Sequence, residues 1–402
     1  MFQTVASAQL GDALTRIPDG ETGERRLFVL WQGEQAFAQN PAFRQTGGRL
    51  KPQQFRAYEL RPGVDVERLE FSSLGYAQAA LSSYAAFRRL QEEGVIQPGI
   101  RFQVNLPSPF NPLSIFLTKR DVGRVEAAYE AAMLAEVDQI VEAIPPQDLA
   151  IQWDIPYEVR AWSGNVPVFM LQPWFDNPQE HILNLLTRLG DHIPPPVELG
   201  YHLCYGDYAN HDNLLFMLLG TPKSELIRRL DSKVLNWVGR KFTGPLKDAS
   251  PMVEIASALA SSVSRPINFL HLPVPPGADH AYIAPLAELE RQNHTALYLG
   301  LVSLSDGYEG AMHRITAARQ VINGDFGVAT ECGWGRCRRD DLDTLLRLHR
   351  ALAQPERGIP ERWGWPQFRQ DRLFTTKKNI PPPLGLNARH RSYPDAHDLD
   401  GI

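Results

Sequence analysis

Cysteine, long apolar runs and clustered positive charge are all scarce in this chain. Its 402 residues include only 3 cysteines, too few for a disulfide framework, which favours a reducing compartment such as the cytoplasm. No apolar run approaches the roughly 18 residues that span a bilayer, and the first residues lack the pattern of a secretion signal. The net charge is −5, without a long basic cluster, so neither nucleic acid nor a membrane is an expected partner.

Seven short apolar segments have the composition of buried strands. Each is rich in β-branched or aromatic residues and is bounded by Gly, Pro, Asp or Asn. The segments are 14–21, 99–107, 148–156, 197–207, 267–275, 296–303 and 326–332. Longer segments with helical periodicity lie mostly between them. These predicted helices are 122–144, 179–190, 212–219, 248–263, 282–291, 307–323 and 339–354.

The alternation of strands and helices predicts an α/β fold with a mainly parallel sheet, because parallel strands are joined by right-handed helical crossovers. We expect a (β/α)8 TIM barrel, which fits the chain length. Such a barrel needs eight strands, and residues 1–13 have the pattern of a helix that leads into the strand at 14–21. The first strand is therefore expected to be missing or degenerate, as a late start or a shortened chain would explain. A doubly wound open sheet is the alternative.

The C-terminal residues differ from the rest of the chain. Residues 1–365 are expected to form a single catalytic barrel domain. Residues 366–402 contain a PPP run, few apolar residues and no periodicity, so they are expected to form an irregular tail. This tail fits wrapping either around its own barrel or around a second copy in a homodimer.

The most informative local pattern is His202-Leu203-Cys204 at the end of a predicted strand. Side chains alternate along a strand, so His202 and Cys204 point the same way. Cys332 ends another predicted strand, and the ends of parallel barrel strands meet at one rim. An imidazole and two thiolates that meet there suit zinc. The alternative is a chance pattern in which the cysteines are small buried apolar residues; Cys337, among arginines, is not an expected ligand.

Four motifs in order resemble those of cobalamin-independent methionine synthases. They are PDGE ending in Glu21, Gln152-x-Asp154-x-Pro156, YHLCYGD around His202, and ATECGWG around Cys332. Together they cover residues 14–335. The resemblance implies the barrel that this family shares with the uroporphyrinogen decarboxylase superfamily, whose members include thiol-directed methyl and alkyl transferases.

The resemblance also implies a set of zinc ligands. His202, Cys204 and Cys332 match three ligands of the family, whose fourth ligand is a glutamate on an intermediate strand. Here the matching strand ends in His271. His271 can serve as the fourth ligand, leave the position to water or substrate, or be a hydrogen-bonded histidine of the barrel lining. With histidine in place of glutamate, the ligand set is one charge less negative and the metal more electrophilic.

The resemblance assigns the substrate amine to two acidic residues. Glu21 and Asp154 match the carboxylates that hold the ammonium group of homocysteine in the family. Gln152 lies on the same inward side as Asp154, and Asp19 and Glu158 are weaker candidates of the same kind. Salt bridges to neighbouring arginines such as Arg25 are the alternative for these acids.

The chain departs from the family in one stretch. Methionine synthases carry D-x-H-S on the strand aligned with 296–303; Ser303 is retained here as a candidate substrate contact, but Gly300 and Val302 replace the Asp and the His. Folate-linked proton delivery is therefore not expected, which leaves the donor open. Trp334 is a further candidate that either stacks on a substrate ring at the barrel mouth or packs between strand and helix.

These observations predict a zinc-dependent methyl or alkyl transferase that acts on a small-molecule thiol or an amino-acid-like substrate. Two alternatives remain. One is a metal-free, decarboxylase-like barrel in which His202 and Cys204 only line the cavity. The other is a catalytically degenerate barrel that binds a small molecule.

Overall fold

The computed structural model of the chain describes residues 14–20, 22–23, 25, 29–46, 57–166, 171–206, 246–337 and 339–353. All of them belong to one compact unit, Met1–Gly358. The predicted helices at 1–13 and 212–219, the predicted tail at 366–402 and Glu21 lie outside the described residues.

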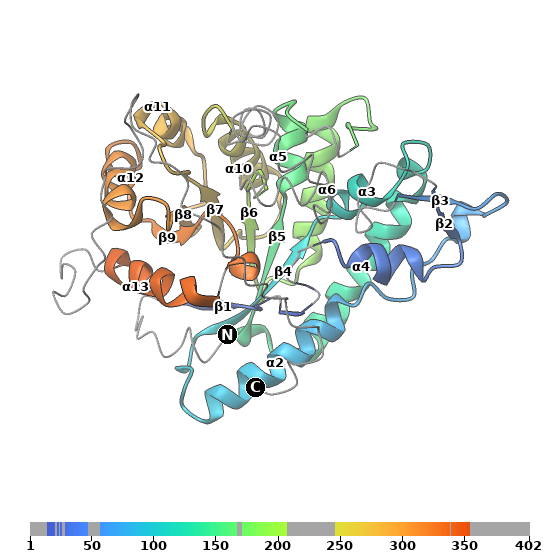
Figure 1. Cartoon of the computed structure of the whole chain (residues 1–402), viewed down its shortest axis with the longest axis horizontal. Helices are drawn as coiled ribbons and strands as arrows, with labels where there is room; N and C mark the ends of the chain where they lie inside the picture. The colour runs from blue at the N-terminus through green and yellow to red at the C-terminus, as the bar shows by residue number, and fades with distance from the viewer. Residues whose placement is uncertain are drawn as a thin grey trace, which may run out of the picture. The chain divides into compact units, whose positions relative to one another are not determined.

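A parallel sheet of seven strands forms the centre of this unit (Figure 1). Its strands are β1 (Arg16–Pro18), β4 (Arg101–Pro107), β5 (Leu149–Asp154), β6 (Glu198–His202), β7 (Phe269–Pro273), β8 (Ala296–Val302) and β9 (Gly327–Thr330). Each falls within one of the seven predicted segments, so all seven predicted strands are confirmed. Every residue of β5 is buried, as expected for a strand covered on both faces.

The order of the strands in the sheet is their order along the chain, β1-β4-β5-β6-β7-β8-β9, and every pair is parallel. A doubly wound sheet reverses its strand order at a switch point, so this alternative was wrong. Among the described residues β1 and β9 are the edge strands. The described residues form a TIM-like barrel that lacks one strand, and an eighth strand would close it between β1 and β9.

Side chains at the amino-terminal ends of the strands show how strongly the sheet curls. Arg16 of β1 forms an ion pair with Glu198 of β6 and donates a hydrogen bond of 2.8 Å to the Tyr298 hydroxyl of β8. Its guanidinium also lies 4.0 Å from the ring centroid of Phe269 of β7. None of these three strands is a neighbour of β1 in the sheet, so Arg16 can reach them only across the interior of a barrel. The four side chains fill the barrel interior at this end.

Helices surround the sheet in Figure 1. They are α2 (Tyr76–Glu92), α3 (Phe110–Phe116), α4 (Val122–Ala143), α5 (Pro156–Trp162), α6 (Pro178–His192), α10 (Ser250–Ser262), α11 (His280–Ile283), α12 (Gly307–Val321) and α13 (Leu342–Ala353). Neighbours along the chain pack together, as α5 does with α6 and α12 with α13. Within the described residues, no helix is both long and apolar enough to cross a bilayer.

The predicted helix at 282–291 was wrong in its extent. The structure has the short helix α11 followed by a 3-10 turn over Ala284–Glu288. Pro285 lies in this turn and has no N–H to donate to a preceding carbonyl, so a regular α-helix does not continue through it. The other predicted helices within the described residues are confirmed by α4, α6, α10, α12 and α13.

An insertion between β1 and β4 was not predicted. It contains the antiparallel hairpin of β2 (Phe43–Gln45) and β3 (Tyr58–Leu60), which lies at the edge of the view in Figure 1. Phe37 is fully buried and contacts the rings of Phe43 and Tyr58, with centroid distances of 5.4 and 5.8 Å. A small aromatic core therefore holds the insertion.

The start of α2 is fixed by an acidic residue of α4. The buried carboxylate of Glu136 accepts backbone N–H groups of Leu74, Gly75 and Ala77 at 2.6, 3.0 and 2.5 Å. Leu74 and Gly75 directly precede α2 and Ala77 belongs to its first turn, the place where N–H groups have no partner within the helix and negative charge is favourable. The insertion is thus anchored to the barrel helices.

Gly200 of β6 offers a test of packing inside the barrel. A Cβ atom there would lie 2.2 Å from the ring of Phe269, so we expect Gly200→Ala to lower the free energy of unfolding by about 1–3 kcal/mol. Urea unfolding measures it. The control is Gly123→Ala in α4, where a Cβ would make an ordinary contact at 3.4 Å. A Gly200→Ala protein as stable as the control would contradict the expectation.

Candidate metal centre

The candidate site lies at the carboxyl-terminal ends of β5 and β6 and beside His271 of β7, a strand that does not end at His271 as expected but continues to Pro273. Asp154 pairs in register with His202, and His202 pairs in register with His271. In-register residues of neighbouring parallel strands point to the same face of the sheet, about 4.8 Å apart. Three polar side chains therefore form a row at the rim of the barrel.

Three potential metal-binding side chains meet at this rim. The ligand atoms of His202, Cys204 and Cys332 all lie within 4.8 Å of one another. His202 and Cys204 are buried, with 3% and 5% of their surface exposed, and Cys332 is half-buried. The structure thus brings together the three residues that the sequence motifs indicated, from positions 130 apart in the chain. Within the described residues, no fourth His, Cys, Asp or Glu joins this group.

Both ring nitrogens of His202 face hydrogen-bond acceptors. Nδ1 lies 3.1 Å from Oδ1 of Asp154, and Nε2 lies 3.1 Å from the backbone oxygen of Glu331. Burial lowers the pKa of His202, but the hydrogen bond and charge of Asp154, with Cys332 and the Glu331 carbonyl, outweigh it and raise the pKa to about 9. In this arrangement the ring is an imidazolium that donates from both nitrogens.

Asp154 is itself held by a chain of side-chain amides. Gln152 donates a hydrogen bond of 2.8 Å to Oδ1 of Asp154, and the Gln152 oxygen accepts one of 3.3 Å from Gln103 of β4. Oδ1 therefore receives both protein hydrogen bonds. Oδ2 has no hydrogen bond to any described residue and remains available for a ligand.

His271 lies beside this cluster. Its ring stacks on that of His202, with centroids 4.2 Å apart and planes 9° apart. Its Nε2 lies 2.9 Å from the backbone oxygen of Thr330; because a carbonyl only accepts, Nε2 carries the hydrogen. Burial and the neighbouring His202 lower the pKa of His271 well below its ordinary value, which keeps the ring neutral.

The ends of β6 and β9 are tied together although two strands separate them in the sheet. Besides the contact of His202 with the Glu331 carbonyl, the Tyr205 hydroxyl donates a hydrogen bond of 3.2 Å to the Glu331 carboxylate. Tyr205 follows Cys204, and Glu331 precedes Cys332. The sequence analysis did not single out Glu331. Its position next to the candidate ligand Cys332 was the only sequence signal for its side chain, and nothing in the sequence indicated the contact of its backbone oxygen with His202.

Comparisons with known proteins give a likeness to solved structures only. No protein-family description matches the chain, and no curated protein matches it. The chain is similar to a protein from Listeria monocytogenes assigned as a vitamin-B12-independent methionine synthase, at 15% identity and a TM-score of 0.44, over 87% of this chain and 85% of that one. It is also similar to a B12-independent methionine synthase from Shewanella sp. W3-18-1 in complex with selenomethionine, at 12% identity and a TM-score of 0.49, over 88% and 87%.

Both structures bear the name of the family that the sequence motifs resemble. Their identities are low and neither TM-score reaches 0.5, so the fold assignment stands on the strand order and the function proposed for this chain stands on its own site.

Three of the predicted substrate contacts already have protein partners. Asp19 forms an ion pair with Arg25, 2.7 Å between Oδ2 and Nη1, as the alternative interpretation expected. The hydroxyl oxygen of Ser303 lies 3.0 Å from that of Ser305. Trp334 donates from Nε1 to the Thr330 hydroxyl at 2.9 Å and contacts the ring of His349 of α13. Their roles in binding a substrate stay predictions.

A buried glutamate lies in α5, just after the end of β5. Glu158 of α5 is fully buried; one carboxylate oxygen accepts a hydrogen bond from Ser108, and the other has no hydrogen-bond partner. Ser108 and Asn111 in turn donate to the backbone oxygen of Asp154, at 3.1 and 3.3 Å. This network fixes the carbonyl at the end of β5.

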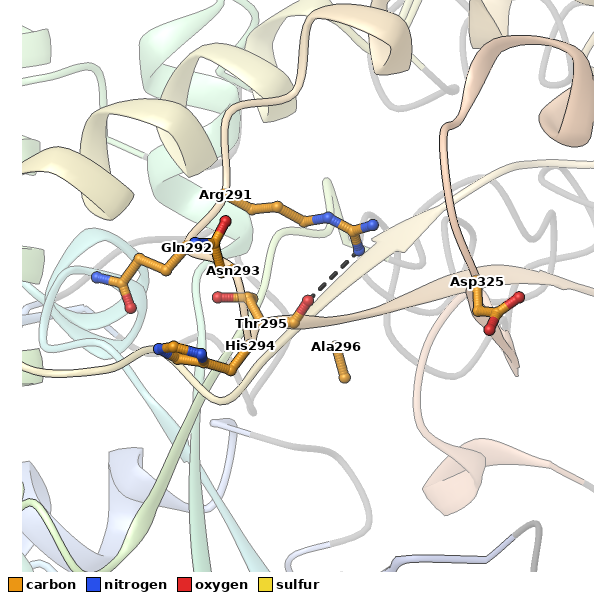
Figure 2. Close-up of a pocket in the computed structure, with 7 residues that line it drawn as sticks. All are labelled: Arg291, Gln292, Asn293, His294, Thr295, Ala296 and Asp325. Atoms are coloured by element: carbon orange, nitrogen blue, oxygen red, sulfur yellow. Dashed lines mark hydrogen bonds between the residues drawn. The ribbon is translucent and has the colours of Figure 1, made fainter.

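A hollow of about 400 Å³ opens at the opposite end of the sheet. Figure 2 shows Arg291, His294 and Asp325 among the residues that line it, next to Ala296. Ala296 is the first residue of β8, so this hollow lies at the amino-terminal ends of the strands. Barrel enzymes place their chemistry at the carboxyl-terminal ends, where the His202 cluster lies.

Glu158 predicts a pH dependence of stability. Burial raises its pKa from 4.5 to about 7, so between these values the folded chain binds one more proton than the unfolded chain. Its contribution to the free energy of unfolding therefore falls with rising pH, by about 3 kcal/mol in all. We expect Glu158→Gln to remove this fall, as urea unfolding at pH 5 and pH 8 would measure.

The control for Glu158 is Glu142→Gln, which changes an exposed glutamate of α4 and is expected to keep the wild-type pH dependence. Equal pH dependence in wild type and Glu158→Gln would show that the Glu158 carboxyl does not titrate as described.

Proposed function

We propose that this chain is a zinc-dependent methyl or alkyl transferase that acts on a thiol. The observation that carries the proposal is the convergence of His202, Cys204 and Cys332 within 4.8 Å at the carboxyl-terminal rim. One imidazole and two thiolates are typical zinc donors. Buried sulfur and nitrogen donors also favour zinc over magnesium or calcium, which prefer oxygen.

The number of donors favours a catalytic over a structural role. Structural zinc sites are closed by four protein ligands, whereas catalytic sites have three and keep one position for water or substrate. The described residues supply three. Zinc held there supplies the positive charge that makes a nearby thiol easier to deprotonate.

Asp154 would serve both the metal ligand and the substrate. Its Oδ1 accepts from Nδ1 of His202, an arrangement of carboxylate and histidine that orients metal-binding imidazoles. Its Oδ2 is left to accept from the ammonium group of an amino-acid-like thiol, and Glu21 is proposed as the second acceptor. Orientation of this kind brings the sulfur into line with the electrophilic carbon.

The reaction is a substitution at carbon. The thiol gives its proton to solvent, and a bond forms between sulfur and the methyl or alkyl carbon. The bond between that carbon and the donor breaks with its electron pair on the donor. Gly300 and Val302 stand where the related synthases carry the proton-delivering pair, so we propose a donor other than a folate.

A metal-free barrel is the second candidate. The observation that favours it is that both nitrogens of His202 already have acceptors, Asp154 and the Glu331 carbonyl. In such a barrel the positive charge of the imidazolium, and not a free N–H group, would attract an anionic substrate in the manner of a decarboxylase or of a binding protein. Zinc analysis separates the two candidates.

Replacing either cysteine of the cluster is expected to remove the metal. Protein purified without a histidine tag should hold one zinc per chain, and Cys204→Ser and Cys332→Ser should lose it together with at least about 100-fold of thiol alkylation, because each leaves only two donors. Cys337→Ser, which changes a cysteine outside the cluster, is the control. Zinc-free wild type, or a Cys204→Ser protein with full activity, would overturn the proposal.

Asp154→Asn is expected to discriminate between substrates. Loss of the carboxylate charge should lower kcat/KM for a thiol with an amino group by about 10-fold to 100-fold more than for the same thiol without it. Comparing the two thiols cancels any effect that acts through His202, since both need the metal. An equal loss for both thiols would show that Asp154 does not bind the amine.

A further inference from the structure

The segment that carries Cys332 is held by side chains at three consecutive carbonyls. The backbone oxygen of Thr330 accepts from His271 at 2.9 Å, that of Glu331 from His202 at 3.1 Å, and that of Cys332 from the Thr330 hydroxyl at 2.7 Å. Thr330 is the last residue of β9, so the sheet no longer fixes the backbone beyond it. Side-chain donors replace the sheet at the point where Cys332 must be placed.

Two of these three donors are the stacked histidines. His202 and His271 are register partners on β6 and β7, and each uses its Nε2 on a neighbouring carbonyl of the same segment. The contact of His271 has to pass over β8, which lies between β7 and β9.

Gly300 of β8 makes this contact possible. A Cβ atom at Gly300 would lie 2.7 Å from the Thr330 oxygen and 3.0 Å from Nε2 of His271. Any other residue would push apart the two atoms of the hydrogen bond. The pairing of β8 with β9 is also irregular here, with a register shift between Gly300 and Val302. His271 and Gly300 both differ from the residues of the methionine synthases that the sequence resembles. The two differences go together, because the hydrogen bond of His271 to the Thr330 carbonyl needs the space that Gly300 leaves.

Metal binding would leave His271 as the remaining histidine anchor. Asp154 occupies Nδ1 of His202, so Nε2 is the nitrogen that a metal would take, and the Glu331 carbonyl would lose its donor. The Thr330 carbonyl would keep its donor, because the Nε2–H group of His271 already donates to it and is not needed by the metal.

We propose that His271 is a positioning residue, and not a zinc ligand, that holds the Thr330 carbonyl and thereby keeps Cys332 beside His202 and Cys204. The inference rests on the proposed function, because it assigns His271 a task in the same metal centre. It also leaves the fourth coordination position to the thiol substrate.

Four variants of the full chain test the role of His271. His271→Gln keeps an N–H donor in place of Nε2, and His271→Leu removes the donor. Gly300→Ala leaves His271 in place but adds a methyl group that pushes the His271 ring and the Thr330 carbonyl apart. His294→Leu, an exposed histidine near the amino-terminal end of β8, is the matched control. Urea unfolding shows that each variant is folded.

Zinc affinity and the visible spectrum of the cobalt-substituted protein are the first readouts. We expect His271→Leu and Gly300→Ala to bind zinc about 10-fold to 100-fold more weakly, while His271→Gln and His294→Leu bind it nearly as wild type. The cobalt spectrum should be unchanged in every loaded variant, because the donors are the same. Wild-type affinity in His271→Leu, or a changed cobalt spectrum in His271→Gln and His271→Leu, would overturn the inference.

A readout without zinc keeps the inference separate from the proposed function. Phenylarsine oxide binds two thiols only when their sulfurs lie close together, so metal-free wild type should capture it through Cys204 and Cys332. Because His202 still holds the Glu331 carbonyl in the metal-free protein, His271→Leu and Gly300→Ala should weaken this capture without abolishing it, and His271→Gln should keep it. If wild type binds no zinc but shows this pattern, the function fails and the positioning role stands; capture by His271→Leu as by wild type overturns the role.

Discussion

The register between β5, β6 and β7 is the constraint on which the candidate centre depends. Asp154, His202 and His271 are neighbours across three parallel strands, so strand spacing alone puts their side chains within contact distance. This spacing allows the imidazoles to stack and the carboxylate to reach Nδ1 of His202. A shift of one residue would turn a side chain of this row to the opposite face of the sheet.

The curl of the sheet brings together strand ends that are not neighbours in register. Strands β6 and β9 are not neighbours, yet His202 and Tyr205 both contact Glu331, so the rim closes on itself over β7 and β8. Two glycines permit this closeness. Gly200 leaves room for the Phe269 ring inside the barrel, and Gly300 lets His271 meet the Thr330 carbonyl.

The two ends of the barrel interior differ in chemistry. At the amino-terminal end Arg16 is committed to Glu198, Tyr298 and Phe269, which satisfies its charge within the protein. At the carboxyl-terminal end, Oδ2 of Asp154 has no hydrogen bond to a described residue, and the ligand atoms of His202, Cys204 and Cys332 lie within 4.8 Å of one another. Stability at one end and available ligand atoms at the other are the usual division of labour in such barrels.

Local patterns in the sequence determined the seven strands, most of the helices, and the common direction of the His202 and Cys204 side chains. These features depend on composition and alternation within a few consecutive residues. They also indicated Cys332, whereas Asp154 was indicated by the resemblance to methionine synthases. The hairpin of β2 and β3 escaped prediction because its strands have only three residues each, too few to show a period. Only the tertiary structure decided that Arg25 pairs with Asp19, that Thr330 and Glu331 offer their carbonyls to two histidines, and that His271 directs its Nε2 to one of them. The two histidine contacts join side chains to the backbone of a distant segment, and a linear pattern carries no information about which backbone oxygen a folded strand end will present. For Asp19 the pattern left open whether the partner was Arg25 or a substrate.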